Sequence, residues 1–221
     1  DSAPATRVCC SARHCAPWFG ASLRTALRSA RVEALACARG SAGRIAAFEA
    51  SHSDLVIMTR PERGREQALR HLMLNDVLIH SRRPLLLVPA DWTGGFVGRN
   101  VAIAWNGQRE ATRALVGAQA ILEQADRSTI VTIDDGRCLD WRDRGVRIQR
   151  HLERRGHNVQ LRTIENTGRP IDEVLLTECR ALGADLIVMG GYGHSRLEEL
   201  VLGSATRSLV SASPVPLLLA H

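Results

Sequence analysis

Lysine is absent from this 221-residue sequence, and all 29 basic residues are arginines. A phosphate loop of the GxxxxGK[ST] type needs a lysine ammonium group, and Schiff-base catalysis needs a lysine amine, so both are excluded. Arginine binds phosphate through its planar set of N–H donors, and a phosphate-bearing ligand is compatible with the composition. The net charge is +6, but basic and acidic residues are interleaved, so we expect no nucleic-acid partner.

Long apolar segments are absent too. No run approaches the ~20 residues of a membrane-spanning helix, and the first residues show no charged leader followed by an apolar stretch. We therefore expect a cytoplasmic protein that has no membrane partner. The N-terminal cysteines and His14 have no second ligand pair at zinc spacing, so we expect free thiols in a reducing compartment and no metal site.

Two short motifs occur twice in the chain. The sequence DLVIM at 54–58 resembles DLIVM at 185–189, and PLLL at 84–87 recurs at 216–219. The spacing between the two motifs differs by a single residue between the copies. We interpret this as a tandem duplication.

The two copies differ in extent. We predict an incomplete, degenerate first domain at 1–92, a linker at 93–99 and a complete second domain at 100–221. Compared with the second domain, the first has no counterpart of the initial strand and helix. Residues 1–40 are rich in Ala, Arg, Ser and Cys and follow neither a helical nor a strand period, so the pattern predicts no particular element there.

Strands and helices alternate along the second domain. Apolar or alternating runs predict strands at 101–104, 129–133, 159–161, 186–189 and 216–220. Helices are predicted between them, at 111–122, at 143–155, from Pro170 to Leu182 and after Gly203. This order predicts an α/β fold with a doubly wound, open, parallel five-stranded sheet of order 3-2-1-4-5, and a partial second copy at the N-terminus.

A glycine-rich loop follows the fourth of these strands. Gly190, Gly193, Gly203 and Ser204 have the spacing G-x2-G-x9-G-S. Glycine permits a close backbone approach to a ligand and a positive φ. Gly203 and Ser204 begin a helix, whose free N–H groups attract phosphate. The loop therefore predicts a phosphate site, although such glycines also occur in simple tight turns.

Two arginines and the end of the first strand extend this site. Arg196 and Arg207 have guanidinium groups that can contact a triphosphate. Asn106 ends the first strand, which lies beside the fourth in a sheet of this order, so both strands face one crevice. We interpret the neighbouring Trp105 as packing under a helix rather than stacking on a base.

At these residues the chain resembles the universal stress protein family, whose ATP-binding members carry this glycine pattern. The resemblance covers 100–221 and, more faintly, 46–91. It implies the adenine nucleotide alpha hydrolase-like form of the fold and ATP as ligand, with or without magnesium. It also implies contacts from Ala104, Asn106 and Ile133 to adenine, from Met189, Gly190 and Gly193 to the ribose and first phosphates, and from Gly203, Ser204 and Ala205 to the distal phosphates. The family's strand-one ending Asp-Gly-Ser is here Asn106-Gly107-Gln108.

Three functions fit this pattern. The first is a nucleotide-responsive stress module that acts through shape or partners and is not an enzyme. The second is slow ATP hydrolysis, for which Asp134 and Asp135 are the acidic pair that lies well for holding a metal. The third is a scaffold that binds no nucleotide. In each case 216–220 can pair with 84–88 of the same chain or with its own copy in a homodimer.

Overall fold

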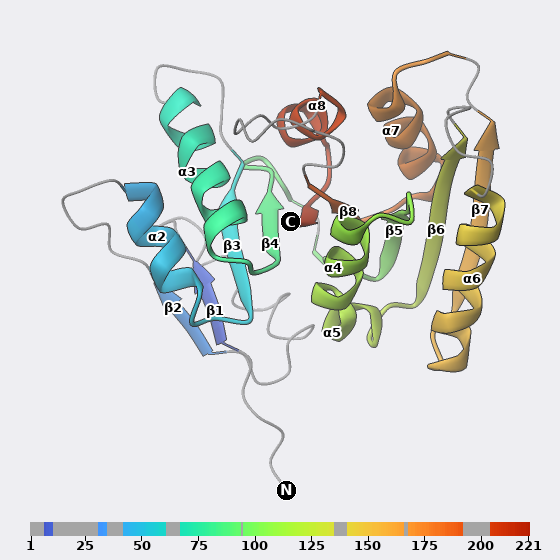
Figure 1. Cartoon of the computed structure of the whole chain (residues 1–221), viewed down its shortest axis with the longest axis horizontal. Coiled ribbons are helices and arrows are strands. Elements are labelled where there is room, and N and C mark those ends of the chain that lie inside the picture. The colour runs from blue at the N-terminus through green and yellow to red at the C-terminus, as the bar shows by residue number, and fades with distance from the viewer. Residues whose placement is uncertain are drawn as a thin grey trace, which may run out of the picture.

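The computed structural model describes most of the chain, namely residues 7–10, 31–34, 42–60, 67–93, 95–134, 141–165, 168–191 and 204–221. These residues form an α/β fold on a single sheet with the strand order β2-β1-β3-β4-β9-β8-β5-β6-β7 (Figure 1). All neighbouring strands are parallel except β4 and β9, which are antiparallel. The sheet thus has nine described strands, where the sequence predicted five and a partial copy, because β4 extends it beyond β9.

The C-terminal segment, residues 95–221, contributes five strands in the order β7-β6-β5-β8-β9, which reads 3-2-1-4-5 along this segment. The strands are β5 (Asn100–Ala104), β6 (Arg127–Asp134), β7 (Val159–Glu165), β8 (Leu186–Gly190) and β9 (Leu217–Ala220). The helices are α4 (Arg109–Gly117), α5 (Gln119–Leu122), α6 (Trp141–Arg154), α7 (Ile171–Leu182) and α8 (Ser204–Ala212). The helix expected at 111–122 is divided at Ala118 into α4 and α5.

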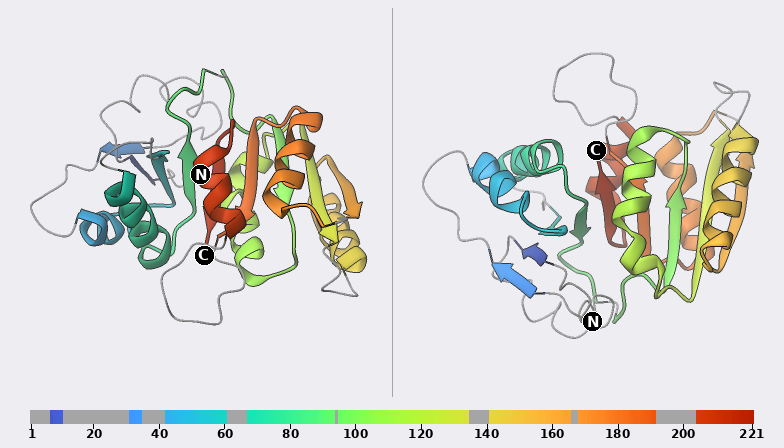
Figure 2. Two further views of the ribbon diagram at one scale, coloured as in Figure 1. Left: turned by 90° about the horizontal axis from the view of Figure 1, so that it is seen from above. Right: turned by 60° about the horizontal axis from the view of Figure 1, so that its bottom comes forward.

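Helices cover both faces of these strands (Figure 2). Alternate strand residues such as Ile103 and Val188 pack with α4, α5 and α6 in one apolar cluster. The intervening residues, such as Ala102 and Ile187, pack with α7 and α8 in a second cluster. Leu186 to Val188 are buried throughout, as a central parallel strand requires.

The N-terminal segment, residues 7–93, adds four strands and two described helices. These are β1 (Arg7–Cys10), β2 (Arg31–Ala34), α2 (Ala42–Ala50), β3 (Leu55–Thr59), α3 (Gln67–His80) and β4 (Leu85–Val88). The sequence pattern predicted no element in the region of β1 and β2, since their short runs include Arg, Cys and Glu. β1 pairs directly with β3, and β2 lies outside β1.

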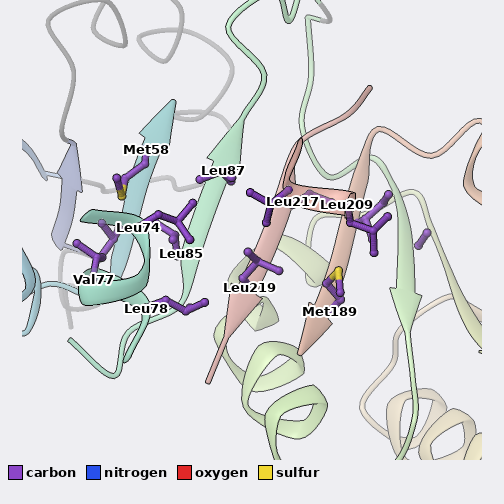
Figure 3. Close-up of a cluster of buried hydrophobic side chains, with 14 of the residues drawn as sticks. Met58, Leu74, Val77, Leu78, Leu85, Leu87, Met189, Leu209, Leu217 and Leu219 are labelled. Carbon is purple, nitrogen blue, oxygen red and sulfur yellow. The ribbon is translucent and has the colours of Figure 1, made fainter. Parts of the chain in front are cut away.

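The two segments meet at β4 and β9. Leu85, Leu86 and Leu87 pair with Leu219, Leu218 and Leu217. The cluster around α7 and α8 continues across this junction to α2 and α3, so that Leu78 and Leu87 lie in the same cluster as Leu217 and Met189 (Figure 3). The two segments therefore share their core.

Candidate functional site

The carboxyl ends of β5, β6 and β8 lie side by side. Ala104 is paired with Met189 of β8 and with Val131 of β6, and Ile133 lies two residues farther along β6. Ala104 and Ile133 are half-buried and pack against the cluster that holds the buried Met189. These side chains form an apolar surface on the α7 and α8 face of the sheet.

The turn after β5 presents a polar group at the same edge. The side-chain Oδ1 of Asn106 accepts a hydrogen bond from the Gln108 backbone N–H at 3.0 Å, and Gly107 adopts a φ of +72°. Arg144 of α6 lies over the turn and donates from Nη1 to the Asn106 carbonyl oxygen at 3.4 Å. Among the described residues, no acceptor contacts the amide nitrogen of Asn106, whose side chain is exposed.

Trp105 lies on the other face of the sheet. Its side chain packs against the cluster of α4, α5 and α6. The interpretation that it packs under a helix is thus confirmed. Its indole Nε1 is buried and has no hydrogen-bond partner among the residues that the structure describes.

Gly190 lies so close to a helix that no larger residue fits at this position. A Cβ at this position would lie 2.7 Å from the backbone nitrogen of Ala111 and 2.8 Å from the carbonyl carbon of Glu110, both in the first turn of α4. Gly190 is not one of the described glycines with a positive φ, so it does not use the left-handed conformation that glycine permits. The close approach there is to α4, which glycine permits because it has no side chain.

Glu110 is a residue that the sequence analysis missed. It is buried in the first turn of α4, beside Gly190, and its Oε1 lies 3.1 Å from Nε of Arg109, whose side chain is largely exposed. An acidic residue near the start of a predicted helix was the available signal. Its burial depends on how α4 crosses β8, which a helical period does not show.

The start of α8 completes the described part of the edge. The helix begins at Ser204, and Ala205 is half-buried. Arg207 is exposed, and its charge, together with burial as the larger cause, lowers the pKa of His71 on α3. Arg207 therefore lies near the N-terminal segment.

Some predicted positions cannot be compared with the structure. Those outside the described residues are Tyr192, Gly193, His194, Arg196, Gly203 and Asp135.

Residues 99–221, more than half of the chain, match the sequence pattern of the Universal stress protein family. The chain belongs to this family. Universal stress protein YxiE of Bacillus subtilis (strain 168) is 28% identical over 125 residues, which are 54% of this chain and 84% of that protein. Family membership supports a role in the stress response.

Solved structures extend the likeness in fold. A universal stress protein from Archaeoglobus fulgidus DSM 4304 superposes with a TM-score of 0.69 at 18% identity, over 87% of this chain and 70% of that chain. A functionally unknown protein from Pseudomonas aeruginosa PAO1 has a TM-score of 0.58 at 14% identity, over 96% of this chain and 80% of that chain. Both likenesses span more of the chain than residues 99–221.

Other reactive groups of this universal stress protein fold are buried or dispersed. Burial, with a smaller contribution from Glu178, raises the pKa of the Cys179 thiol to about 12, so this cysteine is a core residue of α7 and a poor nucleophile. Asp134 is half-buried at the end of β6. Within the described parts of the chain, no three His, Cys, Asp or Glu residues are grouped to hold a metal, and no helix is long and apolar enough to cross a membrane.

Proposed function

We propose that the carboxyl ends of β5, β6 and β8 bind an adenine nucleotide, with ATP as the ligand, with or without magnesium, in a stress-response module that is not an enzyme. One observation carries this proposal. β5 and β8 are neighbours in the sheet, although β6 and β7 separate them in the chain. In open parallel sheets, ligands bind at the carboxyl edge where the winding reverses in this way.

The chemistry of this edge suits a nucleotide. The half-buried Ala104 and Ile133 offer an apolar surface to adenine, and the amide nitrogen of Asn106 offers a donor to the base or a ribose hydroxyl. Toward the phosphates, we assign Met189, Gly190, Gly193, Arg196 and Gly203, and the start of α8 at Ser204 and Ala205. The N–H groups of that helix start favour anions.

We also propose that the N-terminal segment is a partial second copy that binds no nucleotide. Two backbone hydrogen bonds recur in both segments: Val56 N–H to Pro84 O matches Ile187 N–H to Pro216 O, and Arg60 N–H to Val88 O matches Gly191 N–H to Ala220 O. At the position of Gly191, the N-terminal segment thus carries Arg60. The Arg60 guanidinium donates to the Ser213 carbonyl oxygen beyond α8 and is engaged in holding the segments together.

The pairing of β4 with β9 bears on assembly. β4 lies on the edge of β9 within one chain. We propose that this pairing takes the place of a homodimer through β9, because an edge strand that is already paired offers no backbone groups to another copy.

Calorimetric titration of the full chain with ATP and magnesium tests the site. We expect one nucleotide per chain, and a loss of affinity of at least about tenfold in Ala104→Phe and Gly203→Val, because each substitution adds bulk at a position assigned to contact the nucleotide. Ala181→Phe, on an exposed position of α7, is the control and should bind as the wild type does. Absence of binding at millimolar ATP would favour the scaffold, and steady release of phosphate would favour slow hydrolysis.

A further inference from the structure

A row of arginines runs along the solvent side of α6. Arg147, Arg150 and Arg154 are spaced by three and four residues, which places them on one face of the helix. All three residues are exposed, whereas Ile148 and Leu152, on the other side of the helix, pack against the sheet. The helix lies beside β7, the outermost described strand of the C-terminal segment, at the end of the molecule opposite α2 (Figure 1). We call these three arginines the α6 row.

The arginines of the α6 row have no acidic partner within the described parts of the chain. No ion pair there includes any of the three. Glu153, an acid on the same helix, accepts instead from Nε2 of Gln149 at 2.9 Å. Arg154 donates from Nε to the carbonyl oxygen of Arg150 at 3.2 Å, and this acceptor is neutral. The three guanidinium groups therefore keep their positive charge available to a partner.

Positive charge is concentrated in the part of the chain that contains the α6 row. Residues 134–143 contain four acids and two arginines, whereas residues 144–157 contain five arginines and a single acid. The second of these stretches therefore has a formal charge of +4. Asp126 lies near the end of α6, since its carbonyl oxygen accepts from Nδ2 of Asn158, but its carboxylate pairs with Arg99 at 3.9 Å. The charge of Asp126 is thus directed to an arginine outside the row.

The chemistry of the α6 row favours duplex phosphates over other acidic partners. The row has no Phe, Tyr or Trp between its members, and its intervening aliphatic residues face the sheet. Single-stranded nucleic acids stack their bases on aromatic side chains, and a helix that lies on a membrane needs an exposed apolar face. Exposed ion pairs to a protein contribute little affinity without a buried apolar anchor. Binding to duplex phosphates needs only basic side chains, because the release of counterions drives it.

We propose that the α6 row binds the phosphate backbone of a double-stranded nucleic acid without sequence preference. The expectation of no nucleic-acid partner rests on the interleaving of charges along the whole sequence, whereas the helix brings arginines of successive turns into one row. The row extends over about 10 Å, the axial length of about three phosphates of one strand. It lies on the face of the sheet that α4, α5 and α6 cover, opposite the apolar surface of the proposed nucleotide site. The two sites are therefore distinct.

Fluorescence anisotropy of labelled duplexes, titrated with the protein at about 50 and about 200 mM salt, tests the proposal. Three phosphate contacts give a slope of log K against log salt of about −2.7, so this rise in salt should weaken binding about fortyfold. The double variant Arg150→Gln, Arg154→Gln retains one contact, and the same rise should weaken its binding only about 3.5-fold. The control variant Arg44→Gln, Arg180→Gln removes two exposed arginines of α2 and α7 and should keep the wild-type slope.

Duplex DNA and duplex RNA of one sequence distinguish the two sources of the phosphate backbone, and binding of either with this dependence supports the proposal. Glutamine and arginine have similar helix propensities, so Tm of both double variants should match that of the wild type. Absence of binding at ~100 μM protein and low salt, or an equal loss of slope in both double variants, would overturn the proposal. Tighter binding of poly-glutamate or of phosphatidylserine vesicles than of either duplex would assign the row to an acidic protein or a membrane, and would also overturn it.

Discussion

The unit β3-α3-β4 and the unit β8-α8-β9 have the same backbone plan and different ends. In both units a buried serine follows the helix, and its Oγ accepts an N–H two residues later: Ser81 from Arg83 and Ser213 from Val215. The first strand then ends at Thr59-Arg60 in one unit and at Gly190-Gly191 in the other. The two units thus share buried leucines and a serine turn and differ at the end of their first strand.

The glycine at the end of β8 is required by a contact outside the unit. Gly190 lies against the first turn of α4, where a Cβ would contact backbone atoms at 2.7 and 2.8 Å. Thr59, at the matching place, carries a side chain and is half-buried. The glycine at the end of β8 is therefore required by the close approach of α4, and the proposed nucleotide site at this edge lies beside the same helix.

The largest effect is expected where the two units meet. Leu86 and Leu218 are fully buried partners across β4 and β9, so Leu86→Ala and Leu218→Ala should each destabilise the chain by about 2–5 kcal/mol. Because the residues are in contact, the double variant should lose less than the sum. Urea unfolding, followed by tryptophan fluorescence and circular dichroism, measures both. Two separate transitions, of which Leu86→Ala shifts one alone, would show that the segments unfold independently.

Exchanging the two strand ends should separate the fold of the unit from its site. Gly190→Thr forces α4 away from β8 and should destabilise the chain by about 1–3 kcal/mol and weaken ATP binding. The matched change Thr59→Gly should have a smaller effect, about 0.5–1 kcal/mol, and leave ATP binding unchanged. Urea unfolding and ATP titration of both variants measure this. Equal effects would mean that α4 does not impose the glycine.

The strands of the C-terminal segment could be predicted from the sequence. The remaining features depend on contacts between residues that are distant in the chain. Apolar runs at 129–133 and 186–189 predicted strands of a parallel α/β fold. A strand that is covered by helices on both faces of the sheet needs such a continuous apolar run. β1 and β2 have no such runs. The edge pairing was left open because the leucines of β4 and β9 suit either an intrachain or an intermolecular partner. Glu110 was missed because its burial arises from the crossing of α4 over β8.

The aspartates that precede β3 and β8 have different surroundings. Asp185 accepts backbone N–H groups from Gly98 at 2.9 Å, Arg99 at 3.0 Å and Asn100 at 3.2 Å, whereas Asp54 is exposed. Asp185→Asn turns one acceptor into a donor facing an N–H and should destabilise the chain by about 1–3 kcal/mol. Asp54→Asn should change stability by about 0.5 kcal/mol or less. Similar losses in urea unfolding would contradict this distinction.

The contribution of Asp185 to the free energy of unfolding should change with pH in a defined direction. Burial raises the pKa of its carboxyl above the ordinary value, against the lowering effect of the backbone hydrogen bonds. The folded chain therefore binds this proton more tightly than the unfolded chain does. The resulting stabilisation is present below the ordinary pKa of about 3.9 and is lost as the pH rises through the raised pKa. The free energy of unfolding of wild type minus that of Asp185→Asn should fall over this window, and a rise would refute it.

A modest loss of stability is expected at the two serine turns. Ser213→Ala removes the hydroxyl that accepts from Val215 N–H at 3.3 Å and donates to Val215 O at 2.7 Å. Ser81→Ala removes the acceptor of Arg83 N–H at 3.2 Å. Each should destabilise the chain by about 1 kcal/mol, with Ser213 slightly ahead because its hydroxyl makes both bonds. Urea unfolding of the two variants measures this difference. A much larger loss in Ser81→Ala would mean that the turn also supports the left-handed Arg82, which follows it directly.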